Sequence, residues 1–308
     1  FMNKNDFIKA IESKPQSIRL IELISLFLGD CKMIWTDWID GNDTDNLNSI
    51  SKKFGFNYFI FKNLKINKWQ ILLSKKKSSI NNFQKLYSEG KINPLITGFE
   101  LGYPECCVNG FNEYERSGDK SLIKHIYDKS DKSERFPFYM NNICSPFSKI
   151  PPKIPGKAYF RKNIEKKFSE FEKLNKNIQG YFLNKILEPF IIWHPCSYQC
   201  KESMKRVRKI YEFFGYLLPK YAEVKKNFFS KPVFFVDDFR FALLNGISVL
   251  DKEKKKTIVV KYDSILKYPK TFISKKDIDF INKRKLFEIE DGRIKNEKDV
   301  KFVILPFF

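Results

Sequence analysis

Two short segments with the same order of residues constrain the fold of this chain more than any other feature. Each has an aromatic ring, then a proline, then cysteines: Tyr103-Pro104-Glu105-Cys106-Cys107 and His194-Pro195-Cys196-Ser197-Tyr198-Gln199-Cys200. Proline is favoured at the first position of a helix, so both segments are predicted to begin helices. The positive end of the helix dipole then favours thiolates at both places. A fold that gives the four thiols one role must bring these distant segments together.

The second segment is predicted to place two cysteines on one helix face. Apolar residues follow Cys200 at alternating steps of four and three, which indicates a buried helical stripe that includes this cysteine. Cys196 lies four residues earlier, hence one turn away on the same face. Both sulfurs could therefore reach one metal ion or cluster. The stripe contains Met204, Val207, Tyr211, Phe214 and Leu218.

The first segment is less regular as a ligand pair. Cys107, Phe111 and Tyr114 form an inward stripe, whereas Cys106 is rotated about 100° around the helix. Both thiols can bind one centre only if the first turn is distorted or the centre is large. Four thiolates from the two segments would satisfy an iron–sulfur cluster or a tetrahedral zinc site, and His194 could replace one of them.

Three interpretations of the cysteines remain open: a metal centre, a thiol redox or nucleophilic role, and plain packing, because free cysteine is commonly buried. Within the first, widely spaced cysteine ligands favour an iron–sulfur cluster over zinc, which is usually held by two close Cys-x-x-Cys pairs. Cys31 and Cys144 lie outside any motif and are expected to be ordinary thiols.

The motifs Gly102-Tyr103-Pro104-Glu105-Cys106-Cys107 and His194-Pro195-Cys196-Ser197-x-x-Cys200-x-x-Ser203 resemble those of a poorly characterised archaeal and bacterial family of unknown function. The resemblance covers fewer than 20 of the 308 residues. It implies shared chemistry at the cysteines and no particular activity.

Composition gives broader limits. The chain has 308 residues, 43% of them hydrophobic, and a formal net charge of +21. An anionic small molecule or a nucleic acid is a possible partner, although joint enrichment in Lys, Asn, Ile and Phe also suits A/T-rich codons. No run is long enough for a membrane span, and the start lacks the apolar stretch of a secretory signal. We therefore expect a cytoplasmic protein, of undetermined oligomeric state.

The pattern of elements predicts an α+β fold in three regions. Residues 1–100 are expected to be an N-terminal α+β region, 101–230 a helical region with the cysteine motifs, and 231–308 a β-rich region. In the first region, three apolar runs are predicted strands: Phe56–Phe61 and Trp69–Leu73, which pair, and Asn93–Phe99. In the last region, Asn245-Gly246 and Asp291-Gly292 are predicted tight turns between short strands.

Several residues are candidates for roles beside the cysteines. His194 and Glu105 adjoin them and could act in acid–base catalysis, and Tyr103 could line a substrate site. Asp237 and Arg240, with Asp238 between them, follow an apolar run and could bind substrate, since loops at strand ends commonly carry function.

Together these features predict a metalloenzyme with a cysteine-ligated centre, most simply iron–sulfur, that acts in sulfur transfer or another modification of an anionic or nucleic-acid-linked substrate. One alternative is a zinc-stapled basic module that binds RNA or DNA without catalysis. The second alternative is a thiol-dependent redox or nucleophilic enzyme.

Overall fold

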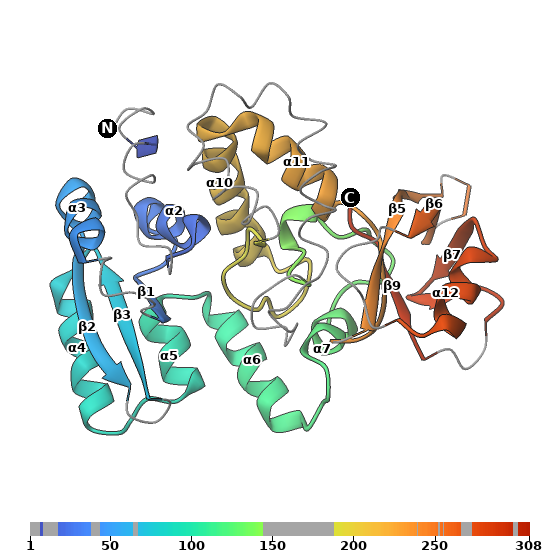
Figure 1. The fold of residues 1–308 in the computed structure, drawn as a ribbon. Coiled ribbons are helices and arrows are strands. Elements are labelled where there is room, and N and C mark those ends of the chain that lie inside the picture. The colour runs from blue at the N-terminus through green and yellow to red at the C-terminus, as the bar shows by residue number, and fades with distance from the viewer. Residues whose placement is uncertain are drawn as a thin grey trace.

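A computed structural model describes residues 7–8, 18–37, 44–63, 67–143, 188–238, 240–251, 253–254, 256–265, 273–297 and 301–308. The architecture is α+β, as predicted, with an antiparallel sheet on each side of a helical centre (Figure 1). Within these residues, no helix combines the length and the apolar character needed to cross a membrane.

The first sheet has three antiparallel strands with β3 in the middle. The predicted pairing of Phe56–Phe61 with Trp69–Leu73 is confirmed. Neighbouring residues of β3 point to opposite faces, and both Ile71 and Leu72 are buried because helices cover both faces. The elements are α2 (Leu20–Leu28), β1 (Met33–Asp37), α3 (Thr44–Phe54), β2 (Asn57–Asn63), β3 (Lys68–Ser74) and α4 (Lys77–Ser88).

The prediction of a strand at Asn93–Phe99 is wrong, because this segment belongs to the helix α5 (Pro94–Leu101). The side-chain oxygen of Asn93 accepts a hydrogen bond from the backbone N–H of Ile96 at 2.9 Å. Pro94 occupies the first helical position, and Gly102 ends the helix with φ 80°. These capping residues outweigh the strand preference of the apolar run. The third strand of the sheet is β1 instead.

The helical centre connects the two sheets. The second cysteine segment does not begin a helix at Pro195 as predicted, since residues 194–200 are not helical and the helix starts at Lys201. A turn closed by a hydrogen bond from the Cys200 N–H to the Ser197 carbonyl takes its place. The elements are α6 (Glu105–Ser117), α7 (Leu122–Asp128), the 3₁₀ helix η2 (Phe138–Met140), α10 (Lys201–Leu217) and α11 (Pro219–Phe229).

The second sheet has the strand order β8-β7-β6-β5-β4-β9. Asn245-Gly246 is not the predicted turn: it lies inside β5, where the register with β6 shifts. A Cβ at Gly246 would lie 1.9 Å from the Lys261 carbonyl oxygen, so glycine allows this close approach. Asp291-Gly292 does form the turn between β7 and β8. The elements are β4 (Val233–Asp237), β5 (Arg240–Leu250), β6 (Thr257–Ile265), α12 (Lys275–Asn282), β7 (Leu286–Glu290), β8 (Arg293–Ile294) and β9 (Val303–Leu305).

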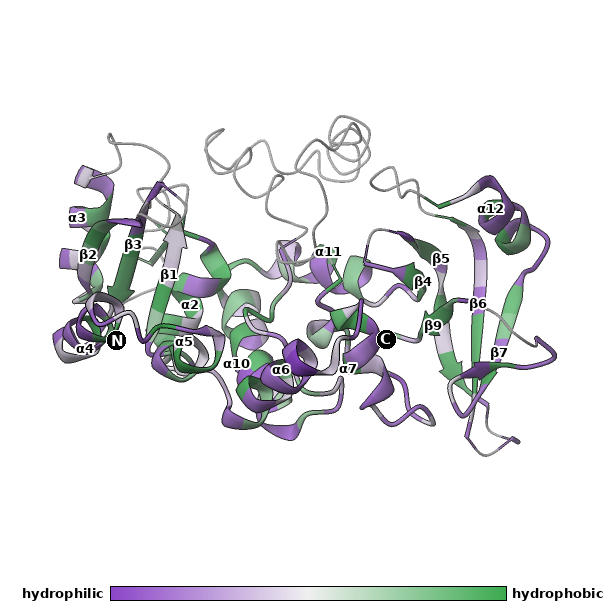
Figure 2. Ribbon diagram, turned by 90° about the horizontal axis from the view of Figure 1, so that it is seen from below, coloured by the Kyte–Doolittle hydropathy of each residue, from purple (hydrophilic) through white to green (hydrophobic). Residues whose placement is uncertain are grey.

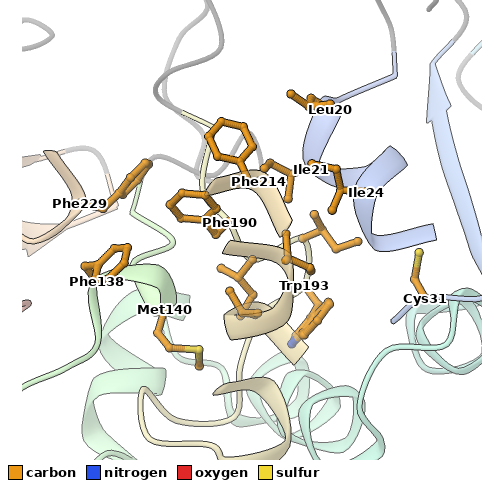
Figure 3. Close-up of a cluster of buried hydrophobic side chains, with 14 of the residues drawn as sticks. Leu20, Ile21, Ile24, Cys31, Phe138, Met140, Phe190, Trp193, Phe214 and Phe229 are labelled. Carbon is orange, nitrogen blue, oxygen red and sulfur yellow. The ribbon is translucent and has the colours of Figure 1, made fainter. Parts of the chain in front are cut away.

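The largest hydrophobic cluster joins residues from all three predicted regions. Ile21 and Ile24 of α2 and Phe214 of α10 meet around Trp193 and Phe190, as Figure 3 shows. Figure 2 shows a hydrophobic stretch between polar residues in both β2 and β3, and both hydrophobic and hydrophilic residues along the helices that cover the sheets. The segment that carries the second cysteine pair is thus packed into the main core.

Candidate metal centre

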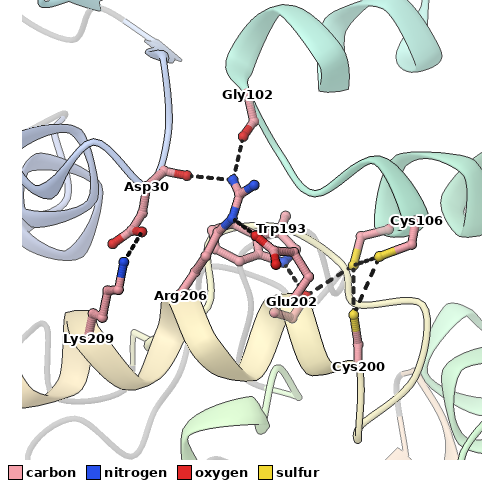
Figure 4. A network of polar contacts seen from close by, with 10 residues as sticks. Asp30, Gly102, Cys106, Trp193, Cys200, Glu202, Arg206 and Lys209 are labelled. Carbon is pink, nitrogen blue, oxygen red and sulfur yellow. Dashed lines mark hydrogen bonds and ion pairs between the residues drawn. The ribbon is translucent and has the colours of Figure 1, made fainter.

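The four motif cysteines converge, as the sequence predicts. The Sγ atoms of Cys106, Cys107, Cys196 and Cys200 all lie within 4.8 Å of one another. Cys200 Sγ is 3.6 Å from both Cys106 Sγ and Cys107 Sγ, and the last two are 3.9 Å apart (Figure 4). Within the described part of the chain, this is the one group of three or more potential ligand side chains close enough to hold a metal ion.

The start of α6 positions the first pair. Pro104 is the N-cap residue, and its carbonyl accepts the backbone N–H groups of Cys107 and Val108. Cys106 is exposed while Cys107 is buried, as their different angular positions on the helix require. Their sulfurs nevertheless approach to 3.9 Å. Adjacent cysteines in a first helical turn can therefore face one point from two sides, without a large centre.

The second pair comes from a turn and a helix cap rather than from one helix face. Cys200 is the N-cap residue of α10, and Cys196 lies in the preceding turn. Tyr198 fixes this turn: its backbone N–H donates to Ser130 Oγ at 2.9 Å, and its buried ring packs against Phe136 and Phe307. The loop conformation thus depends on residues far away in the sequence.

Gly110 lets the turn approach α6. A Cβ at this position would lie 2.8 Å from the Cβ and 3.2 Å from the Cα of Cys196. Gly110 follows Cys106 and Cys107 by one helical turn, so it faces the same side as the first pair. The absence of a side chain here allows Cys196 to reach the other sulfurs.

The buried hydroxyl group of Ser203 contacts the cysteine group. Ser203 Oγ accepts a hydrogen bond from the Trp193 indole N–H at 2.8 Å and lies 3.0 Å from Cys107 Sγ. Ser203 is fully buried. Cys107 and Cys196 lower the pKa of the Cys200 thiol, and Ser203 adds a smaller effect in the same direction. Ser203 thus affects two of the four sulfurs.

Ionisation of all four thiols is unfavourable without a cation. Hydrogen bonds from Cys107 and Cys196 lower the pKa of Cys200, so its thiolate forms first. Hydrogen bonding with Cys196 and Cys200 raises the pKa of Cys107, and burial raises the pKa of Cys106. Each further thiolate would add negative charge beside the first. A divalent cation among the sulfurs removes this penalty.

Arg206 ties the centre to the rest of the core. Its guanidinium donates to the carbonyls of Asp30 at 3.0 Å and Gly102 at 2.8 Å, and it pairs with Glu202 at 2.8 Å (Figure 4). Gly102 directly precedes the Tyr-Pro segment, so one side chain of α10 holds the entry to α6. The two helices that carry cysteines are thereby fixed to each other.

His194 is outside the ligand group, which consists of cysteines alone in the described residues. Its ring stacks on Phe111, with centroids 5.5 Å apart and planes at 14°. Burial, with a smaller effect of the Arg19 charge, lowers the pKa of His194 to about 4. The imidazole is therefore neutral at pH 7 and packs as an aromatic ring.

The other predicted residues beside the cysteines differ in their environments. Glu105 is exposed in the first turn of α6, where a carboxylate suits the helix dipole. Tyr103 packs against Trp193 with ring centroids 5.7 Å apart, and burial raises its pKa well above the usual range. Tyr103 thus packs against the edge of the main core.

Asp237 and Arg240 pair with each other. Arg240 Nε donates to Asp237 Oδ2 at 2.7 Å, and Arg240 N donates to Asp237 Oδ1, across the connection from β4 to β5. Asp238 accepts a hydrogen bond from Ser121 Oγ at 2.7 Å next to the start of α7. Asp237 is thus held by Arg240 in the connection between β4 and β5, and Asp238 is held by Ser121 beside α7.

Cys31 is buried in the main core, apart from the four-cysteine group, and Cys144 lies outside the described residues. Sequence reasoning missed Gly110 and Trp193 as parts of the site, and it gave Ser203 no role although this residue ends the second motif. Gly110 could have been found from its spacing of one turn from the cysteine pair, and Trp193 from its position directly before the second motif. No local pattern marks the contact of Trp193 with Ser203.

Comparisons with protein-family models, curated proteins and solved structures found no match for this chain. The resemblance of the two motifs to a family of unknown function stays a prediction.

Proposed function

We propose that the protein binds one metal ion through Cys106, Cys107, Cys196 and Cys200, and that zinc is the first candidate for this ion. The supporting observation is the spacing of their sulfurs, all within 4.8 Å. A metal–sulfur bond of about 2.3 Å in a regular tetrahedron places ligand sulfurs about 3.8 Å apart. The three distances of 3.6, 3.6 and 3.9 Å match this value.

The spacing favours a single ion over the cluster that the wide sequence separation suggests. In a four-iron cluster each thiolate binds a different iron, which holds the cysteine sulfurs farther apart than around one ion. Zinc accepts four thiolates in a closed tetrahedral site, and a single iron could occupy the same ligand set. Such a centre would cross-link α6 to the start of α10 and stabilise the core.

Metal analysis of the purified protein tests this proposal. We expect one zinc or iron per chain, no acid-labile sulfide, and a tetrahedral thiolate spectrum after exchange with cobalt. Replacing Cys107 or Cys200 with serine should abolish stoichiometric binding, whereas Cys31→Ser, a control outside the group, should retain it. Metal-free protein would refute the centre. Four irons with sulfide would replace the single ion by the iron–sulfur cluster that the sequence spacing favours.

A second proposal concerns the partner: a polyanion, with nucleic acid as the first candidate, binds along α10. Lys201, Lys205 and Lys209 recur at four-residue steps on this helix and are exposed, beginning directly after Cys200. Lys209 Nζ lies 3.9 Å from Asp30 Oδ1. Among the described residues, no ion pair is found for Lys201 or Lys205. Together with the charge of +21, this row suits phosphate groups.

Salt-dependent binding of single-stranded RNA and DNA tests this role. The double variant Lys201→Glu with Lys205→Glu should weaken binding and reduce the slope of affinity against salt by roughly two counterions. Lys275→Glu with Lys276→Glu, on α12, is the matched control, since both lysines are exposed. Equal losses in the two variants would indicate attraction by net charge alone and refute a site on α10.

A further inference from the structure

The four sulfurs differ in their access to solvent. Cys107 and Cys200 are buried, Cys196 is half-buried, and Cys106 is exposed. The backbone of α6 at Gly110 packs directly against Cys196, which limits approach to that residue. Cys106 is therefore the ligand that an outside molecule can reach most easily.

The sulfurs also differ in their hydrogen bonds. The Ser203 hydroxyl lies 3.0 Å from Cys107 Sγ, which is buried beside it. In the described residues, the sulfur contacts of Cys106 are the other thiols, and no N–H or O–H group donates to it. Hydrogen bonds withdraw electron density from a thiolate, so the Cys106 sulfur is more nucleophilic than that of Cys107, and its exposure distinguishes it from Cys196.

The charge of the centre strengthens this difference. Four thiolates around a dication carry a net charge of −2, and that excess lies on sulfur. Where Ser203 supplies a donor, part of the charge is stabilised. At Cys106 it is exposed to solvent without such a donor.

We propose that Cys106 is a reactive ligand of the centre, a thiolate that accepts an alkyl group from an electrophile with a good leaving group. The Cys106 sulfur supplies the electron pair for the new sulfur–carbon bond. The carbon–leaving-group bond breaks, and the leaving group departs with its electrons. No oxidant or reductant is needed, and the other three cysteines keep their metal bonds. The inference rests on the proposed metal site and adds a reaction to it.

Competitive labelling of the zinc-loaded protein tests the proposal. The protein is treated with substoichiometric iodoacetamide and quenched over time. It is then unfolded with chelator, and the remaining thiols are blocked with N-ethylmaleimide before mapping by tandem mass spectrometry. We expect Cys106 to be carbamidomethylated at least about tenfold faster than Cys107, Cys196 or Cys200. Fragment ions separate Cys106 from its neighbour, and Cys31 provides a buried reference.

Metal content measured before labelling separates the two proposals. Protein without metal would refute the centre itself. A loaded protein in which Cys196 reacts first, or all four ligands react equally, would overturn the role of Cys106 and leave the centre intact. Cys106→Ser should retain zinc through three thiolates and lose most of the fast labelling. If this variant loses zinc, the order in which the four cysteines of the unmodified protein are labelled still tests the role of Cys106.

Discussion

The Cys107 sulfur lies 3.0 Å from the Ser203 hydroxyl oxygen, which also accepts the indole N–H of Trp193 at 2.8 Å. An indole nitrogen can only donate, so Trp193 occupies a lone pair of the oxygen. The hydroxyl proton is then free to point to the sulfur. Trp193 thereby orients a hydrogen bond that stabilises the Cys107 thiolate, although its own hydrogen bond goes to Ser203 and not to a cysteine.

Replacing Ser203 with alanine should weaken metal binding. The substitution removes the hydrogen bond to Cys107 and leaves the Trp193 N–H buried without its acceptor. We expect metal affinity to fall about 10- to 100-fold and the free energy of unfolding to fall by about 1–3 kcal/mol. Chelator competition and denaturant unfolding measure the two effects. Ser197→Ala, in the neighbouring turn, is the control, and equal affinities in both variants would contradict the role of Ser203.

Gly110→Ala should disrupt the centre although alanine is the better helix former. A Cβ at Gly110 would lie 2.8 Å from that of Cys196, so the turn must move away. We expect a loss of metal affinity and about 1–3 kcal/mol of stability. Gly215→Ala on α10 is the matched control, because its Cβ would meet only Ala222 at 3.7 Å. That variant should gain up to about 1 kcal/mol. Unchanged metal binding in Gly110→Ala would show that the turn does not depend on this glycine.

Phe307→Ala should act on the centre from a distance. Phe307 is fully buried and packs edge-to-face on Tyr198, with centroids 5.2 Å apart, so its loss loosens the turn that holds Cys196. We expect a decrease of about 3–5 kcal/mol in the free energy of unfolding, together with weaker metal binding. Phe308→Ala should cost less than about 1 kcal/mol, because its ring is 44% exposed and contacts Arg135. Similar losses in the two variants would refute this coupling.

His194 should make the protein less stable in acid. Burial lowers its pKa to about 4 in the folded state, from about 6.5 in the unfolded chain. Between these values only the unfolded state binds the additional proton, so stability falls as the pH decreases from 6.5 to 4. His194→Phe keeps a ring to stack on Phe111 and carries no proton. The free energy of unfolding of this variant, taken relative to its value at pH 8, should fall less between pH 6.5 and pH 4 than that of the unmodified protein.

The measurement requires metal-free, reduced protein, because acid also releases a thiolate-bound metal. Denaturant unfolding at several pH values compares the two proteins. Parallel profiles of the free energy of unfolding against pH would show that His194 does not contribute to the loss of stability in acid.

Much of the fold follows from local patterns in the sequence. The strand pair around Ile71, the turn at Asp291-Gly292 and the start of α6 after Pro104 depend on periodicity and capping, which act over a few residues. The same reasoning failed at Asn93–Phe99, where the Asn93 cap and Pro94 favour a helix over the apolar run. It also failed at Gly246, where the close contact with β6 becomes evident only once the strands are paired.

For the centre, the sequence alone determined which residue types are available: four cysteines in two similar segments. The tertiary structure decided how they meet. Tyr198 holds the second segment in a turn through Ser130, Phe136 and Phe307, so Cys196 and Cys200 do not share a helix face. Such contacts join residues far apart in the chain and have no local signature. The distances between the sulfurs, which distinguish one ion from a cluster, therefore depend on the packed core.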